Sequence, residues 1–202
     1  MNTIEYEQER IIPSKVICIG RNYVDHIKEL HNETPTKMVI FNKPNSAVSN
    51  ELKYFSEDTR YEGEICFLIK NNKIDGIGFG LDLTKAKEQN ILKKQSLPWE
   101  RAKSFDGAAV FSKFVKFKGD ISQIRLELFI NGNLIQSGSY ELMIYKPSEM
   151  IEEINSFMTL VDGDIIMSGT PKGVGTYKKN DIFEGKIYLK DTLLVSSSWK
   201  VI

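Results

Sequence analysis

The sequence contains only two cysteines among its 202 residues, Cys18 and Cys66, and both lie in apolar stretches typical of strands. We therefore expect buried free thiols rather than a disulfide framework. An excess of charge of either sign is also missing, because Lys and Arg together number 27, as do Asp and Glu. Attraction to nucleic acid or to a membrane surface through a net charge is therefore not expected.

Long apolar runs are lacking as well, and the longest are far too short to cross a bilayer. Residues 1–14 have neither the basic start nor the apolar centre of a secretory signal. We therefore expect a cytoplasmic protein. The length suits one core, so the sequence predicts an N-terminal extension over residues 1–14 and a single domain over residues 15–202.

The most informative stretch runs from Arg60 to Ile69. Its second half is apolar and rich in strand-forming residues, and its first half places Glu62 and Glu64 two residues apart. On a strand these two carboxylates point to the same face, where burying either one unpaired would be costly. A hard divalent cation such as Mg²⁺ or Mn²⁺ would remove that cost. Alone, the pattern is more typical of a solvated edge strand.

A third carboxylate follows a second strand. Residues 73–83 read as a strand, and Thr84 is expected to cap a short helix over about residues 85–95. Asp82 would then stand between strand and helix, as a natural third ligand. The glycines at 76, 78 and 80 lack the full dinucleotide-binding pattern, so we interpret them as a place where another backbone approaches closely.

Proton-transfer groups occur in two other segments. Residues 21–31 have a helical apolar stripe, and His26 and Glu29 are neighbours beside it, either as a catalytic pair or as an incidental surface contact. Residues 101–107 read as a loop in which Lys103 is either partly buried, with a lowered pKa, or an ordinary surface lysine. Lys43 lies at a strand-to-loop junction after residues 38–41, where ligand contacts often collect.

The C-terminal half predicts a hairpin, one helix and closing strands. Asn131-Gly132 indicates a tight turn after a strand over residues 124–130. Ser148 is expected to cap the next helix, and its core face is predicted to contain Met150, Ile151, Ile154, Phe157 and Met158. The glycine-rich residues 168–175 read either as a solvent loop or as an anion-binding loop that uses backbone N–H groups and the Thr170 hydroxyl.

Together these segments resemble the fumarylacetoacetate hydrolase family, and within it the small acylpyruvase/oxaloacetate decarboxylase branch. The matching stretches follow the family order from about residue 15 to the end. They are Gly20-Arg21-Asn22-Tyr23, Asp25-His26, Glu29, Lys43-Pro44, Glu62-x-Glu64, Leu81-Asp82-Leu83-Thr84, Leu97-Pro98-Trp99, Ala102-Lys103-Ser104-Phe105, Met158-Thr159-Leu160 and Gly169-Thr170-Pro171-x-Gly173-Val174-Gly175.

The resemblance implies an α+β, β-rich fold, a mixed β-sandwich roll with a few short helices, in which residues 15–202 form the catalytic domain of a homodimer. It implies that Glu62, Glu64 and Asp82 hold Mg²⁺ or Mn²⁺. His26 and Glu29 would activate water on a lid formed by residues 21–37, and Lys103 would transfer a proton. Arg21, Lys43, Gln89, Gly169 and Thr170 are expected to contact a 2-oxo or 2,4-dioxo acid.

Two positions depart from the branch. Tyr61 stands where the branch often has histidine, and Ala86 stands where it tends to have arginine, so how the far end of a substrate is held is open. Lys85 or Lys87 could compensate. The main expectation is hydrolysis of a C–C bond in acylpyruvates. Oxaloacetate decarboxylation or 2-oxo acid tautomerisation on the same site is the alternative, and a non-catalytic metal-dependent binding protein is a further one.

Overall fold

Strands dominate the computed structural model, which describes residues 1–29 and 36–202. The α-helices are α1 (Val24–Glu29), α2 (Ala86–Lys94), α3 (Glu100–Lys103) and α4 (Pro147–Asn155), with 3₁₀ turns at Asn45–Ala47, Ile121–Gln123 and Tyr140–Leu142. The strands are β1 (Ile4–Tyr6), β2 (Glu9–Ile11), β3 (Lys15–Gly20), β4 (Val39–Pro44), β5 (Val48–Ser49), β6 (Thr59–Tyr61), β7 (Gly63–Lys70), β8 (Lys73–Asp82), β9 (Thr84–Lys85), β10 (Ala109–Phe111), β11 (Val115–Lys116), β12 (Ile124–Ile130), β13 (Asn133–Ser139), β14 (Ile165–Met167), β15 (Gly175–Thr176), β16 (Ile182–Leu189) and β17 (Thr192–Lys200). The predicted β-rich α+β class is confirmed.

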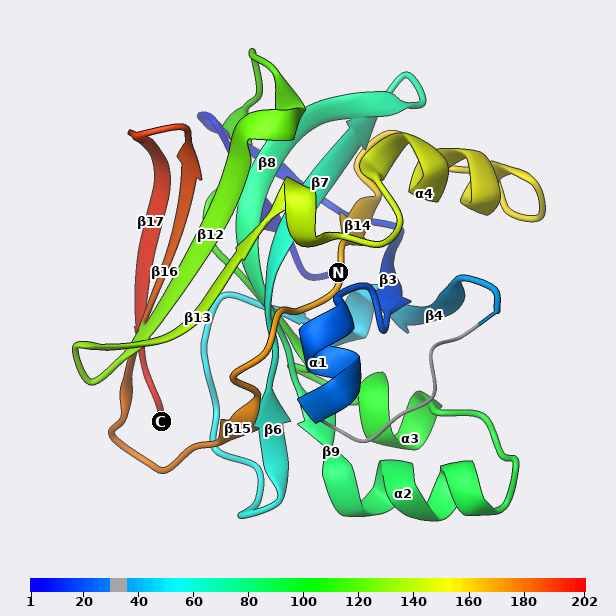
Figure 1. The fold of residues 1–202 in the computed structure, drawn as a ribbon, viewed down its shortest axis with the longest axis vertical. Helices are drawn as coiled ribbons and strands as arrows, with labels where there is room; N and C mark the ends of the chain where they lie inside the picture. Colours follow the sequence, from blue (N-terminus) through cyan, green and yellow to red (C-terminus); the bar gives the residue numbers. More distant parts are fainter. Residues whose placement is uncertain (30–35) are drawn as a thin grey trace.

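The larger sheet follows the order β4-β3-β14-β7-β8-β10-β5, with β11 also paired to β8. A second sheet, β13-β12-β16-β17, stands beside it, and β15-β6-β9 forms a small third sheet at the lower end in Figure 1. In that view α1 lies near the lower ends of β7 and β8, above α2 and α3. The arrangement leaves the ends of β7 and β8 surrounded by short helices rather than by long strands.

The main core lies between the two larger sheets. Alternate residues of β7 and β8, such as Phe67 and Phe79, face the second sheet and are fully buried. Phe79 lies against β16 at Gly185, where an added Cβ would come within 2.4 Å of the ring. The close approach of the two sheets therefore requires glycine at position 185. The same contact limits how far β8 can shift over β16.

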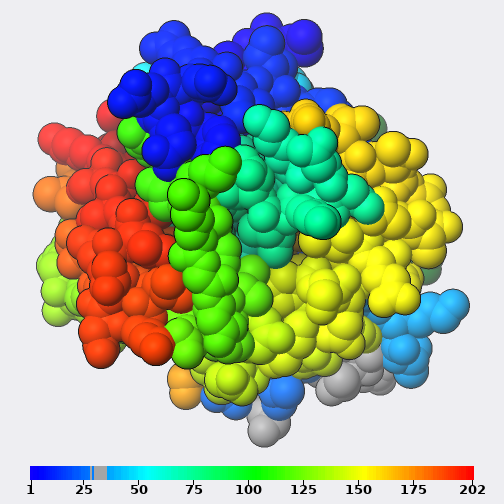
Figure 2. All heavy atoms as spheres, turned by 90° about the horizontal axis from the view of Figure 1, so that it is seen from above, coloured from blue at the N-terminus to red at the C-terminus, as the bar shows by residue number. Residues whose placement is uncertain are grey.

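The other face of the larger sheet carries a second apolar cluster, covered by residues 1–14. Ile4 and Tyr6 of the β1–β2 hairpin are buried there, and Glu7 and Phe114 share a backbone hydrogen bond. Figure 2 shows the hairpin in dark blue beside the β7–β8 turn and the segment before β12. The predicted extension thus packs on the domain. Cys18 and Cys66 are buried and free, as expected.

The glycines of β8 make room for side chains rather than for a backbone, contrary to the sequence-based interpretation. Built Cβ atoms would lie 2.9 Å from the Tyr6 ring at Gly76 and 2.9 Å from the Phe114 ring at Gly78. At Gly80 the Cys66 thiol would be only 2.5 Å away. Because these glycines alternate along β8, they all lie on the face that ends at Asp82.

The predicted N-terminus of α2 is wrong in its capping residue. Thr84 belongs to β9, and the N-cap position is Lys85, whose side chain accepts no capping hydrogen bond. Asp58, distant in sequence, accepts a hydrogen bond from the Lys87 N–H at 3.0 Å instead. The Thr84 hydroxyl is thereby left for Glu62, to which it donates at 2.9 Å.

Three further local expectations differ from the structure. Residues 100–103 form a helical turn, α3, where a loop was expected. Helix α4 begins at Pro147 rather than after Ser148, and the Glu149 carboxylate accepts a hydrogen bond from the Lys146 N–H. Phe157 lies beyond the end of α4 and is 59% exposed, so it does not belong to the core face.

The hairpin turn was predicted correctly. Asn131 and Gly132 have φ values of 51° and 80° between the paired residues Ile130 and Asn133, as a two-residue turn of this kind requires. Among the helices of the described ranges, none is long and apolar enough to cross a membrane.

The packing of Phe114 over Gly78 gives a stability prediction. Gly78→Ala should destabilise the protein by about 1–3 kcal/mol, because the added methyl group overlaps the ring. Phe114→Leu removes part of that ring, so Gly78→Ala should cost less in its presence, a coupling measurable by urea denaturation of the four variants. Strictly additive changes in the free energy of unfolding would contradict the contact.

Candidate active site

Strand pairing brings three carboxylates to one face of the larger sheet. The backbone N–H of Asp82 donates to the carbonyl of Glu62 at 2.9 Å, so these residues are opposite one another across β7 and β8. Glu64 lies two residues further along β7 and therefore shares their face. Ligand oxygens of all three lie within 4.8 Å of one another. The sequence placed Glu62 within a strand, whereas here it lies between β6 and β7.

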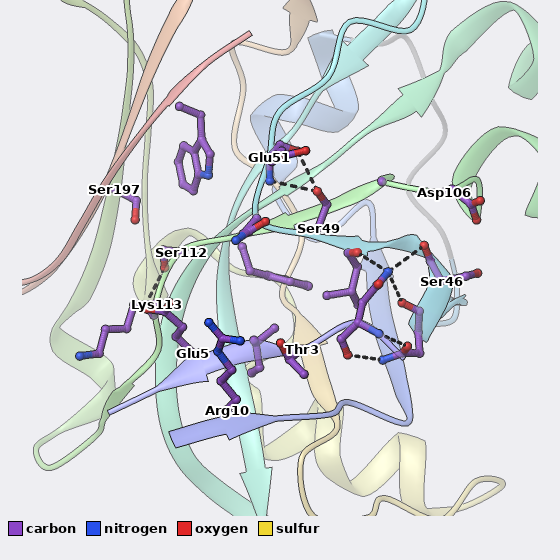
Figure 3. A pocket seen from close by; sticks show the side chains of 18 of the residues that line it. Thr3, Glu5, Arg10, Ser46, Ser49, Glu51, Asp106, Ser112, Lys113 and Ser197 are labelled. Atoms are coloured by element: carbon purple, nitrogen blue, oxygen red, sulfur yellow. Dashed lines mark hydrogen bonds between the residues drawn. The ribbon is translucent and has the colours of Figure 1, made fainter. Parts of the chain in front are cut away.

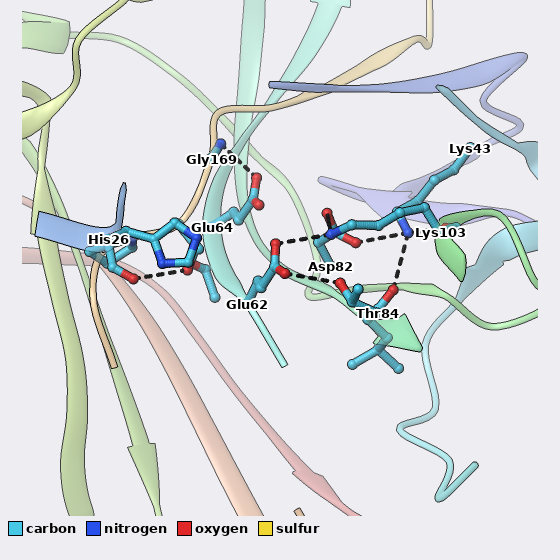
Figure 4. A network of polar contacts seen from close by, with 12 residues as sticks. His26, Lys43, Glu62, Glu64, Asp82, Thr84, Lys103 and Gly169 are labelled. Carbon is cyan, nitrogen blue, oxygen red and sulfur yellow. Dashed lines mark hydrogen bonds and ion pairs between the residues drawn. The ribbon is translucent and has the colours of Figure 1, made fainter. Parts of the chain in front are cut away.

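Two buried lysines contact two of these carboxylates, as Figure 4 shows. Lys103 Nζ lies 3.0 Å from Glu62 Oε2 and 2.8 Å from Asp82 Oδ2. Lys43 Nζ lies 2.8 Å from Asp82 Oδ1 and also donates to the carbonyl oxygen of Lys103. Lys43 therefore joins β4 to α3 beneath Asp82.

Glu64 is the carboxylate left without a lysine. It is buried, and among the described residues its hydrogen-bond donor is the Gly169 N–H at 2.7 Å from Oε2. Burial, followed by the charges of Asp82 and Glu62, raises the pKa of Glu64 well above its usual value. At Glu62, burial acts in the same direction, but Lys103 and His26 outweigh it and lower the pKa.

This donor set fits a hard divalent cation. Three carboxylates supply only oxygen ligands, which suit Mg²⁺ or Mn²⁺. The neutral Gly169 N–H cannot balance the charge of Glu64, and a cation among Glu62, Glu64 and Asp82 would. The three residues that the sequence singled out as metal ligands are thus brought together, and no residue among them points elsewhere.

Lys103 is in neither of the two states that the sequence left open, partly buried with a lowered pKa or an ordinary surface lysine. Its side chain is almost fully buried between Asp82 and Glu62. Burial opposes the charge, yet these two carboxylates outweigh burial and raise the pKa of Lys103. The two carboxylates therefore favour the ammonium form of Lys103.

His26 and Glu29 form the expected pair on α1, with His26 Nδ1 3.3 Å from Glu29 Oε2. The other oxygen, Glu29 Oε1, accepts a hydrogen bond from the Gly173 N–H at 2.9 Å. Both carboxylate oxygens are therefore engaged, one orienting His26 and one tying α1 to residues 168–175. His26 is close enough to Glu62 to lower its pKa.

The lid remains a prediction. Much of the expected lid, residues 30–35, lies outside the described residues. At the start of the segment, the Asn22 side chain donates to the carbonyl oxygens of Tyr145 and Ser168.

The residues expected to contact substrate differ in burial and in the hydrogen bonds that they already make. Arg21 is half-buried, with a φ of 57°, at the turn before α1, and Gln89 is half-buried on α2. Gly169 already binds Glu64, while the Thr170 hydroxyl donates to the Gly63 carbonyl at 2.9 Å. Lys43 has no exposed surface. Their contacts with a ligand stay predictions.

Sequence patterns missed two polar residues that hold this site. Thr84 supports Glu62, as described above. Gln136 is buried on β13, where its amide donates to Thr170 and to the Pro171 carbonyl and accepts from the Gly63 N–H. Its neighbours Leu134 and Ile135 are the exposed residues, so β13 reverses the usual apolar-inside pattern and gives no local signal.

A wide groove lies elsewhere. It has a volume of about 1300 Å³ and runs between the β1–β2 hairpin, residues 44–51 and the end of β17. Figure 3 shows its largely polar lining, which includes Arg10, Glu51 and Ser197 and none of the three clustered carboxylates. This groove is therefore separate from the candidate site.

Comparison with known proteins decides the family. A family model for the C-terminal domain of fumarylacetoacetate (FAA) hydrolase matches residues 15–196. The chain belongs to the fumarylacetoacetate hydrolase family. Within that family, it is 36% identical over 187 residues to oxaloacetate tautomerase YcgM of Escherichia coli, with 83% of this chain and 85% of the relative covered.

A further relative and a solved structure support the same family and fold. A mitochondrial oxaloacetate decarboxylase of Dictyostelium discoideum is 34% identical over 198 residues, covering 88% of this chain and 90% of that protein. A crystal structure from Oleispira antarctica, provisionally assigned as a fumarylacetoacetate isomerase/hydrolase, superimposes with a TM-score of 0.94 at 33% identity, covering 100% of both chains. The predicted family and its sandwich-roll fold are therefore confirmed.

Replacing Glu64, the carboxylate that has no lysine partner, should abolish cation binding. Glu64→Gln should eliminate most of the thermal stabilisation by Mn²⁺, since a ligand at 100 times its Kd stabilises a folded protein by about 2.7 kcal/mol. The exposed Glu57→Gln should retain it. Calorimetric titration of both variants with Mn²⁺ and Mg²⁺ measures the difference, and equal Kd values for the two would remove Glu64 from the site.

Proposed function

We propose that this protein is a metal-dependent tautomerase of oxaloacetate, which interconverts its enol and keto forms. The observation that carries the proposal is the ammonium group of Lys103, held 2.8–3.0 Å from two carboxylates of a cation-binding cluster. Relatives named oxaloacetate tautomerase over nearly the whole chain support the substrate. This is the alternative that the sequence left open, and it is better supported than acylpyruvate hydrolysis.

Glu62, Glu64 and Asp82 would hold the cation. Bound there, Mg²⁺ or Mn²⁺ would polarise the keto oxygen of a 2-oxo acid and favour negative charge on that oxygen. The lysines also position a ligand, because Lys43 and Lys103 each lie 2.8 Å from one of the two oxygens of Asp82. The chain thus holds Asp82 in place before substrate arrives.

Lys103 would supply the proton to carbon 3 of the enol form. It is charged, buried and attached to short helix α3, so its ammonium group is held in one position. His26 would take up the proton that the enol hydroxyl releases, with Glu29 orienting its ring. The net change is transfer of one proton from oxygen to carbon, and exchange with water restores both side chains.

The relatives, rather than the contacts of Glu29, favour tautomerisation over hydrolysis. Acylpyruvate hydrolysis requires a base that takes a proton from water, and the pair of His26 and Glu29 is compatible with that role as well as with proton uptake from an enol. Tautomerisation needs no activated water, and relatives over most of the chain are named oxaloacetate tautomerase. Oxaloacetate decarboxylation is the second candidate, because a relative carries that name and the reaction passes through the same enolate. Hydrolysis of acylpyruvates stays a prediction.

The proposal is tested by following the enol absorbance of oxaloacetate dissolved freshly as the enol form. The enzyme with Mg²⁺ should accelerate its decay, and EDTA should abolish the acceleration. In parallel, pyruvate formed from oxaloacetate is measured with lactate dehydrogenase, which distinguishes decarboxylation from tautomerisation. Pyruvate release from acetylpyruvate, measured in the same way, tests for hydrolysis. Rapid pyruvate release from acetylpyruvate with no acceleration of enol decay would overturn the tautomerase assignment.

Lys103→Met tests the proton donor. The substitution retains length and removes the ammonium group, so kcat for enol decay should fall by ~10²–10⁴-fold. Mn²⁺ should still bind, and more tightly, because Glu62 and Asp82 lose a competing positive charge. The exposed Lys113→Met should match the unmodified protein. Unchanged kcat in Lys103→Met would leave Lys103 a purely electrostatic role.

A further inference from the structure

A half-buried lysine outside the ligand cluster, Lys93, lies at the edge of the candidate site. It occupies the last turn of α2, where Ala86, Gln89 and Lys93 share one face, being three, four and seven residues apart. Ala86 is buried at the start of that helix, two residues after Thr84, which donates a hydrogen bond to Glu62. This face of α2 therefore begins beside the carboxylates and ends at Lys93.

Contacts on α3 connect Lys93 to the site from a second direction. The Lys93 ammonium group lies 5.4 Å from the centre of the Trp99 ring, and Trp99 stands at the N-terminus of α3. Trp99 and Lys103 line the same cavity, which has a volume of about 390 Å³. The Trp99 ring is thus part of the wall of the cavity that Lys103 lines, and the Lys93 ammonium group lies over the same ring.

The charges around Lys93 leave room for an anion. Burial, followed by the charges of Arg21 and Lys103, lowers the pKa of Lys93, while the Glu62 carboxylate acts in the opposite direction with a smaller effect. Positive charge therefore outweighs negative charge around Lys93. Within residues 1–29 and 36–202, no carboxylate lies within salt-bridge distance of Lys93. Cations of like sign repel unless a negative group lies between them.

The other lysines of this region are engaged elsewhere. Lys85 Nζ lies 4.4 Å from the centre of the Phe105 ring. Lys87 is exposed and acts on Asp58, whose pKa it lowers together with a backbone hydrogen bond. The sequence suggested these two as the cations for the far end of a substrate, but the structure favours Lys93 over both.

We propose that Lys93 binds the second carboxylate of a dicarboxylic 2-oxo acid and so selects such acids over monocarboxylic ones. The inference rests on the proposed function. When the first carboxylate and the keto oxygen of oxaloacetate are directed to the ligand cluster, the second carboxylate extends from carbon 3. The ligand cluster offers no positive charge to this second carboxylate, and Lys93 on α2 supplies one.

The test compares two neighbouring lysines. In Lys93→Met, KM for enol-oxaloacetate should rise about tenfold or more, because a charged contact is lost, while kcat changes less than about twofold. The inhibition constant of oxalate should stay within about twofold, since oxalate has no group at the second-carboxylate position. Lys93→Arg should restore most of the affinity, and the exposed Lys94→Met should behave as the unmodified protein.

The outcomes separate this inference from the function on which it rests. An unchanged KM in Lys93→Met, or a parallel rise in the oxalate inhibition constant, would overturn the role of Lys93 while leaving the tautomerase assignment intact. A KM increase of the same size in Lys94→Met would also overturn it, as a general charge effect. If the unmodified protein fails to accelerate enol decay, both proposals fall together.

Discussion

The burial of three carboxylates on one face of a sheet is the constraint around which this structure is arranged. Glu62 and Asp82 face each other across β7 and β8, and Glu64 follows on the same side. Such a group of like charges is unfavourable in a protein interior unless cations accompany it. Two lysines from separate elements, β4 and α3, provide part of the compensation, and a divalent cation would remove the remaining deficit at Glu64.

The rest of the fold positions these charges. Glycines on β8 admit Phe114 and the N-terminal Tyr6, so the face that carries Asp82 is covered by packed side chains along the part of β8 that precedes the site. The second sheet seals the opposite face through Phe79 and Gly185. With both faces packed, β7 and β8 cannot shift in register without moving every side chain to the wrong side. Precise placement of the carboxylates is therefore a consequence of core packing.

Local patterns in the sequence were sufficient for the main strands, the Asn131-Gly132 turn and the shared face of Glu62 and Glu64, because alternation and turn chemistry act over a few residues. They failed where the partner was distant in sequence. Asp58, not Thr84, caps α2, and the buried amide of Gln136 links β13 to Gly63 and Thr170 across the site. The same cause explains Lys103, whose pKa depends on Asp82 and Glu62 rather than on its neighbours.

Function could be predicted from sequence only to the level of shared chemistry. Decarboxylase, tautomerase and hydrolase reactions of 2-oxo acids all use an enolate, so one set of residues is compatible with each of them. Contacts made across the fold add what no local motif could reveal. The Gly173 N–H donates to Glu29 and so links α1 to a loop some 140 positions later.

The most direct test of the account is a crystal structure of the protein with Mn²⁺ and oxalate, using the anomalous signal of manganese. We expect one strong peak coordinated by oxygens of Glu62, Glu64 and Asp82, with oxalate completing the coordination and the Lys103 ammonium group beside it. A peak at another group of side chains, or oxalate bound with no contact to these carboxylates, would contradict the central claim that this cluster is the catalytic metal site.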